Sequence, residues 1–128
     1  MRTPIIAGNW KMNMSVTESV DFVTALAPAI SEYDSVERVV CPTFVALHAV
    51  SEVRADSPVQ VGAQTVHWEN SGAFTSQISP TMLQGIVDYV IIGHSENRAY
   101  LGETDETVNK KVKAALAHGL KPIIAVGE

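Results

Sequence analysis

The sequence predicts an α/β fold with a parallel sheet. Five short apolar segments alternate with four segments that show helical patterning. Strands that alternate with helices in this way pair in parallel, because each helix carries the chain back across the sheet in a right-handed crossover. The length of 128 residues fits one domain, and no Pro/Gly-rich linker divides it. We therefore expect a single domain over residues 1–128.

The first part of the sequence predicts two strands with a helix after each. Residues 4–10 form a short apolar strand, and Ser15 with Glu18 has the spacing of a capping box. In such a box the serine accepts a hydrogen bond from a first-turn amide, and the glutamate bonds back to the serine amide. A second apolar strand covers residues 36–42, after which Thr43 is expected to cap the next helix.

Three more strands are expected in the remainder. The third covers residues 59–64, and a polar segment follows it. Ser79 then opens a short helix that has proline at its first position. The fourth strand covers residues 88–93 and the fifth covers residues 121–128, with a helix between residues 104 and 119.

Composition excludes several classes of protein. Hydrophobic residues make up 46% and charged residues 18% of the chain, which excludes intrinsic disorder, and the apolar runs are too short to span a bilayer. The net charge of −5 without a basic cluster argues against nucleic acid or an anionic membrane as a partner. The N-terminus lacks the apolar segment of a secretory signal, and a single cysteine fits a reducing compartment. We expect a cytoplasmic protein.

Polar residues follow two of the predicted strands, at the end where α/β folds bind ligands. Asn9 and Lys11 are two residues apart, so in an extended chain they point to the same side. His94 and Glu96 have the same spacing, and such a pair can polarise a carbonyl and move a proton. The competing interpretation of Asn9 and Lys11 is a solvated surface pair. For the second pair it is a structural role, in which His94 is hydrogen-bonded at a loop entrance and Glu96 forms an ion pair with Arg98.

The remaining candidates are expected to be structural. His48, His67 and His118 do not have the spacing of a metal site, and we expect them to be structural or solvent-facing. Cys41 ends a strand without a recognisable base, which favours a buried and inert thiol. We therefore expect no metal site, and both tryptophans are expected to be packing residues.

Four stretches of the sequence resemble the triosephosphate isomerase family. They are "AGNWKMN" (7–13), "VGAQTVHWENSGAFT" (61–75), "IIGHSENRAYLGETDE" (91–106) and "KPIIAVGE" (121–128). The stretches occur in the family's order along the whole chain. The resemblance implies the interconversion of dihydroxyacetone phosphate and glyceraldehyde 3-phosphate without a cofactor. It also implies a partial (β/α)₈ TIM barrel, about half of the full barrel, with four βα units and a fifth strand.

The resemblance implies roles for the polar residues at the strand ends. Asn9 and Lys11 would bind the substrate, and Lys11, His94 and Glu96 would be the catalytic residues. His94 would be the electrophile and Glu96 the second carboxylate of the family's site. This family is itself the standard example of a neutral histidine electrophile that works with a glutamate base.

The resemblance also implies a subunit interface. Residues 65–77 are similar to the family's dimer loop, with Gln64 and Thr75 as interface residues and Thr75 reaching a partner's active site. The family usually has Glu where Gln77 stands and Arg where Asn97 stands. Both changes delete a charge, and they would weaken the dimer contact if those two positions normally pair.

The resemblance implies that these residues encode about half of the family's barrel. A complete barrel needs about 250 residues, and the family's catalytic glutamate, lid and phosphate loops are not among these 128. We expect the isolated chain to be inactive or nearly so, and its unpaired edges to associate with a second copy or with a C-terminal half-barrel. Two alternatives stay open. One is a non-catalytic self-associating scaffold, and the other is a small phosphate-binding domain of the flavodoxin type, which would lack the usual glycine-rich loop.

Overall fold

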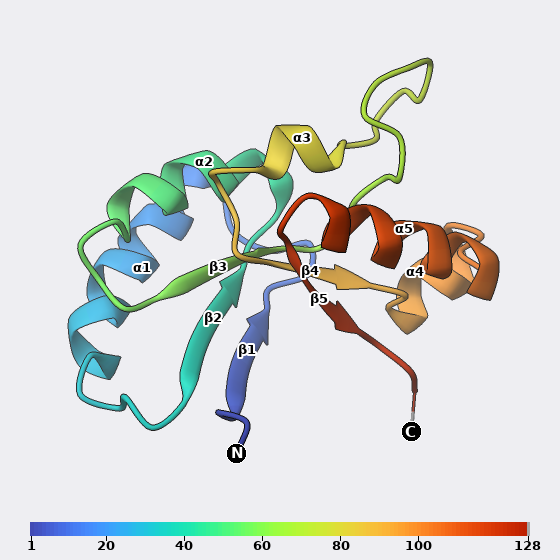
Figure 1. The fold of residues 1–128 in the computed structure, drawn as a ribbon. Coiled ribbons are helices and arrows are strands. Elements are labelled where there is room, and N and C mark those ends of the chain that lie inside the picture. Colours follow the sequence, from blue (N-terminus) through green and yellow to red (C-terminus); the bar gives the residue numbers. More distant parts are fainter. Residues whose placement is uncertain (128) are drawn as a thin grey trace. The chain divides into compact units, whose positions relative to one another are not determined.

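Strands and helices alternate along the chain, as the sequence predicts (Figure 1). The structure is a computed structural model that describes residues 1–127, so the last residue of the predicted fifth strand lies outside the described residues. These residues form two compact units that divide between Gln64 and Thr65. A single domain over residues 1–128 stays a prediction.

The first unit has three strands and two helices. Its elements are β1 (Ile5–Asn9), α1 (Val16–Ile30), β2 (Glu37–Cys41), α2 (Phe44–Val53) and β3 (Gln60–Ala63). Parallel ladders join β1 to β2 and β2 to β3. The helices α1 and α2 pack against each other, and α2 contacts β3 (Figure 1). This order is that of successive right-handed βα units.

Apolar side chains of both helices and of the inner strands form the core of the first unit. Val23 of α1, Val40 of β2 and Leu47 of α2 are buried. In contrast, β1 is exposed along its length, and Ile6 keeps 64% of its surface accessible. A groove of about 520 Å³ lies along β1, α1 and β2, with Trp10 among its lining residues. Within the first unit, a large apolar face along β1 is therefore without a covering element.

Two predicted helix caps differ from the structure. The Ser15 hydroxyl accepts a hydrogen bond from the Glu18 amide at 3.2 Å, as expected, but Glu18 is exposed and makes no return bond. Thr43 lies at the N-cap of α2, yet its side chain does not cap the helix. The Ala46 amide bonds instead to the Thr43 carbonyl at 3.0 Å, which removes the donor that the hydroxyl would have used. The cap predicted for Thr43 is therefore wrong.

The second unit has two strands and three helices. Its elements are α3 (Pro80–Leu83), β4 (Tyr89–Ile92), α4 (Ser95–Tyr100), α5 (Asp105–Ala117) and β5 (Lys121–Ile124). The strands β4 and β5 pair in parallel, and α5 packs against both (Figure 1). The short helix α4 was not expected from the sequence. Among the described residues, no helix is both long and apolar enough to cross a membrane.

A buried ion pair lies within the second unit. Lys111 Nζ is 2.6 Å from Glu103 Oε1, and the two side chains keep only 10% and 3% of their surface accessible. Thr107 Oγ1 donates a second hydrogen bond to the same oxygen at 3.2 Å. Charged groups are rarely buried without a partner, because burial removes their hydration. This pair was not singled out from the sequence.

Gly72 lies in the segment of residues 65–79 that connects β3 to α3, and its backbone φ is +139°. A Cβ atom at Gly72 would lie 2.7 Å from Phe74 Cε2. We predict that Gly72→Ala lowers the free energy of unfolding by about 2–3 kcal/mol, because backbone strain adds to the displacement of the ring. Urea unfolding of the chain measures this loss.

The matched control for this prediction is Gly102→Ala. Gly102 also has a positive φ, +71°, but a Cβ atom there would have no neighbour within 4 Å. We expect only the backbone cost of about 1–2 kcal/mol for this control. Equal losses for the two variants would show that the Phe74 ring does not require glycine at position 72.

Candidate active site

Asn9 and Lys11 are joined by a turn rather than by extended backbone. Asn9 ends β1, and its side-chain Oδ1 accepts a hydrogen bond from the Lys11 amide at 3.0 Å. Lys11 has a φ of +54°, in the left-handed region that non-glycine residues rarely adopt. The extended backbone from Asn9 to Lys11, on which the expected common direction of the two side chains was based, is therefore wrong. A left-handed lysine costs on the order of 1–3 kcal/mol, and such strain is typical of functional sites.

Gln64 supports this turn from the end of β3. Its Nε2 donates to the Lys11 carbonyl at 2.8 Å and to the Cys41 carbonyl at 2.9 Å. The Trp10 amide donates to the same Cys41 carbonyl at 3.1 Å. Gln64 was expected only as an interface residue, and that role stays a prediction. The signal in the sequence was an amide side chain directly after a buried strand, where it can satisfy the carbonyls of neighbouring strands.

His94 lies at the N-cap of α4, directly after β4. Its Nδ1 accepts a hydrogen bond from the Glu96 amide at 3.1 Å. An acceptor nitrogen carries no proton, so this bond assigns the neutral ring its proton on Nε2. Glu96 Oε2 is 3.7 Å from the same Nδ1, which is too long for a hydrogen bond and is not the partner that this tautomer uses. His94 and Glu96 are therefore close to each other, as expected. They are brought together by the first turn of α4 and not by extended backbone.

The neighbours of His94 fix the start of α4. Gly93 has a φ of +77°, and a Cβ atom there would approach Val108 Cγ2 at 3.0 Å. Arg98 Nε donates to the Gly93 carbonyl at 3.2 Å, and Arg98 Nη1 pairs with Asp105 Oδ1 at 2.8 Å. The alternative in which Arg98 pairs with Glu96 is therefore not what the structure shows. Arg98 instead holds the turn that positions the imidazole.

The remaining site predictions fall on residues of the second unit. Thr75 is exposed, and its role at an interface stays a prediction. Gln77 and Asn97 both line one pocket of about 260 Å³, together with Glu103 and Lys111. The two positions at which we expect a charge to be lost relative to the family therefore line the same pocket.

The other titratable candidates have structural surroundings. Burial raises the pKa of the Cys41 thiol to about 11, so the sulfur is protonated and inert near neutral pH. His48 is exposed beside Glu52, and His118 Nδ1 bonds to the Ala114 carbonyl at 2.7 Å. In residues 1–127, no three His, Cys, Asp or Glu side chains converge as metal ligands would.

Comparisons with known proteins agree with this arrangement. Residues 4–128 match the family model of triosephosphate isomerase. The chain is 56% identical to a triosephosphate isomerase of Clostridium perfringens strain SM101 and 57% identical to one of Clostridium botulinum strain Loch Maree, and each match covers the whole chain and 52% of the relative. A crystal structure of the Bartonella henselae triosephosphate isomerase superposes with a TM-score of 0.92 at 38% identity, over 99% of this chain and 53% of that one.

These findings define the class of protein as a TIM-barrel α/β fold, of which the chain has about half. The chain belongs to the triosephosphate isomerase family. It spans about half the length of the relatives that it matches. The predicted half-barrel fold is confirmed, which excludes the flavodoxin-type alternative.

Proposed function

We propose that these residues supply the substrate lysine and the electrophilic histidine of a triosephosphate isomerase. The observation that carries the proposal is the hydrogen bond from the Glu96 amide to His94 Nδ1. It leaves the Nε2–H of a neutral ring as the donor to a substrate. A neutral donor can polarise a ketose or aldose carbonyl and stabilise the enediolate oxygen that forms when the neighbouring carbon loses a proton.

The other residues have complementary roles in this proposal. The Lys11 ammonium attracts the phosphate dianion of the triose, and Asn9 fixes the strained turn that presents it. Glu96 is the second carboxylate of the site. The base that removes and returns the carbon-bound proton comes from the part of the family chain that follows the matched half, and no cofactor takes part. A polypeptide of residues 1–128 alone is therefore inactive in the proposal, and the assembled protein works in the cytoplasm.

The exposed face of β1 supports a need for a second half. The groove along β1 and α1 is lined by large apolar side chains that include Phe22, which is 46% exposed. The relatives have about as much chain again outside the matched part. We propose that a C-terminal half of this kind covers the groove, because it would bury the apolar surface that water otherwise meets. A second copy of the chain is the competing occupant.

An isomerase assay tests the function. We predict that the 128-residue polypeptide does not convert glyceraldehyde 3-phosphate above background, and that adding the C-terminal half of the Clostridium perfringens relative produces turnover. Lys11→Met in the first half should raise KM, because the ammonium that attracts the phosphate is lost while the fold is kept.

The controls separate folding from function. Lys113→Met removes a charge from an exposed position of α5 and should leave KM unchanged. A one-to-one complex of the two halves that binds tightly but never turns over triose phosphates would contradict the proposed function. That result would favour the alternative of a non-catalytic self-associating scaffold.

A further inference from the structure

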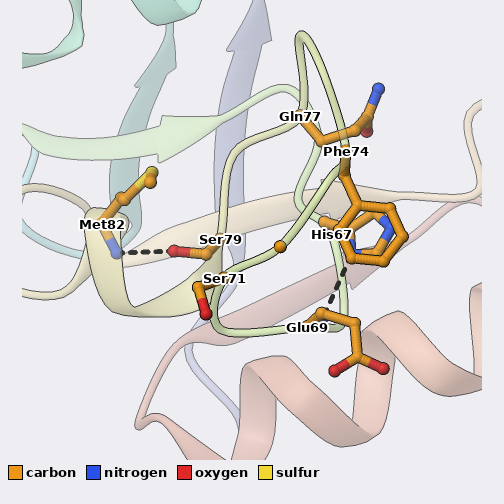
Figure 2. A pocket seen from close by; sticks show the side chains of 8 residues that line it. His67, Glu69, Ser71, Phe74, Gln77, Ser79 and Met82 are labelled. Atoms are coloured by element: carbon orange, nitrogen blue, oxygen red, sulfur yellow. Dashed lines mark hydrogen bonds between the residues drawn. The ribbon is translucent and has the colours of Figure 1, made fainter.

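The segment of residues 65–79 is organised around one buried histidine. The His67 side chain stacks on the Trp68 ring with centroids 4.1 Å apart and contacts the Phe74 ring at 4.2 Å. Only 7% of His67 is accessible. Figure 2 shows the His67 and Phe74 rings against each other beside the pocket that this segment forms, which has a volume of about 50 Å³. Neither the proposed catalysis nor the family comparison gives this histidine a role.

Two hydrogen bonds make the segment depend on His67. The backbone amide of His67 donates to the Ile78 carbonyl at 2.8 Å, which joins the two ends of the segment. The ring Nδ1 accepts from the Glu69 amide at 3.0 Å (Figure 2). A protonated imidazole carries hydrogen on both nitrogens, so it cannot accept this bond. The observed turn therefore requires the neutral ring.

The charges around the ring favour the neutral form. Burial lowers the pKa of His67 below its ordinary value of 6.5, and the positive charge of Lys111 on α5 lowers it further. Glu69 opposes this effect and raises the pKa. Lys111 is itself paired with Glu103, and Lys110 Nζ lies 5.2 Å from the centroid of the Trp68 ring. Lys110 is paired in turn with Glu106 at 3.4 Å, so the two lysines of α5 near these rings each have a carboxylate partner.

We propose that the segment of residues 65–79 is a pH-sensitive element, which is ordered while His67 is neutral and loosens when His67 is protonated. Protonation removes the acceptor for the Glu69 amide and places a cation among aromatic rings beside Lys111. Thr75, the residue expected at a subunit interface, lies in the same segment. Acid would therefore disorder the segment that carries Thr75.

The direction of the effect follows from proton linkage. Above about pH 6.5 the ring is neutral in both the ordered and the loosened segment. In this range the equilibrium between the two forms therefore does not depend on pH. As the pH falls below about 6.5, the loosened segment binds a proton first, and order is progressively lost. The loss ends once the pH is below the lowered pKa of the ordered form.

Hydrogen exchange of the full chain, followed by NMR between about pH 8 and about pH 5, tests this proposal. Between the two pKa values, the protection factor of the Glu69 amide should fall by about tenfold for each pH unit, as expected for one proton. Glu69→Gln keeps the backbone donor but removes the charge that raises the pKa. We expect it to lower the titration midpoint of the His67 ring and to increase the total loss of protection at acid pH.

His48→Gln is the matched control, because His48 is exposed on α2 outside the segment. The pH dependence of the Glu69 amide protection factor should not change in this variant. His67→Phe keeps an aromatic ring but loses the acceptor, so low protection at every pH is expected. Protection factors that do not depend on pH would overturn the proposal. A ring midpoint that Glu69→Gln leaves in place or raises would also overturn it.

Discussion

His94→Gln is expected to lower kcat of the assembled isomerase by about 10²–10³-fold, the loss typical of removing one donor to a developing oxyanion. In the proposed function the Nε2–H of His94 stabilises the enediolate more than the ground-state carbonyl, so the loss should fall mainly on kcat and little on KM. The hydrogen bond at Nδ1 fixes the tautomer on which this argument depends. Steady-state kinetics of the two combined halves measure the change.

A second variant separates this chemistry from the stability of α4. His94→Asn keeps a side-chain acceptor at the N-cap, which asparagine fills well, so the fold should be retained. Asparagine cannot donate from the position of Nε2, and the rate should fall as far as it does with glutamine. A complemented rate that neither variant changes would show that His94 is not the electrophile.

Lys111→Met is expected to lower the free energy of unfolding by about 3–5 kcal/mol, the cost of removing one partner of a buried ion pair. The Glu103 carboxylate would then keep only the Thr107 hydroxyl, because its second oxygen already has no partner. Desolvation of an unpaired charge accounts for most of this cost. Urea unfolding followed by circular dichroism measures the loss.

Two controls decide whether burial of the pair causes the effect. Lys110→Met breaks an exposed pair with Glu106 on the same helix and should cost less than about 1 kcal/mol. Adding Glu103→Leu to Lys111→Met removes the stranded charge and should recover most of the stability. If Lys111→Met lowered the free energy of unfolding no more than Lys110→Met does, the contact between Lys111 and Glu103 would not be a buried electrostatic contact.

The strands were predictable because their signal is local. Val90, Ile91 and Ile92 form an apolar, β-branched run, and the structure buries every residue of β4. Helix starts were less predictable, because a backbone carbonyl can accept the hydrogen bond of a first-turn amide in place of the N-cap side chain. Thr43 fails as a side-chain cap for this reason. Thr104 was expected as one of two possible starts of its helix, and it is the N-cap of α5, but its capping box with Thr107 was not expected.

Sequence reasoning chose the residues of the proposed site, but it did not predict their local geometry. Asn9, Lys11, His94 and Glu96 were identified from their place after two strands, together with the family resemblance. The left-handed backbone of Lys11 and the Nδ1 bond of His94 depend on hydrogen bonds from specific side chains, which spacing alone does not encode. Gln64 was missed as a support for the same reason, because its partners are carbonyls far away in the sequence.

In the proposed function these residues are one half of an isomerase, which needs a second half both to cover β1 and to supply a base. The most direct measurement is size-exclusion chromatography with light scattering, with each fraction assayed for triose phosphate turnover. We predict that the chain alone elutes above its monomer mass of 13.8 kDa without activity, and that active fractions contain both halves. A well-ordered monomer of 13.8 kDa that turns over triose phosphates efficiently would contradict the account.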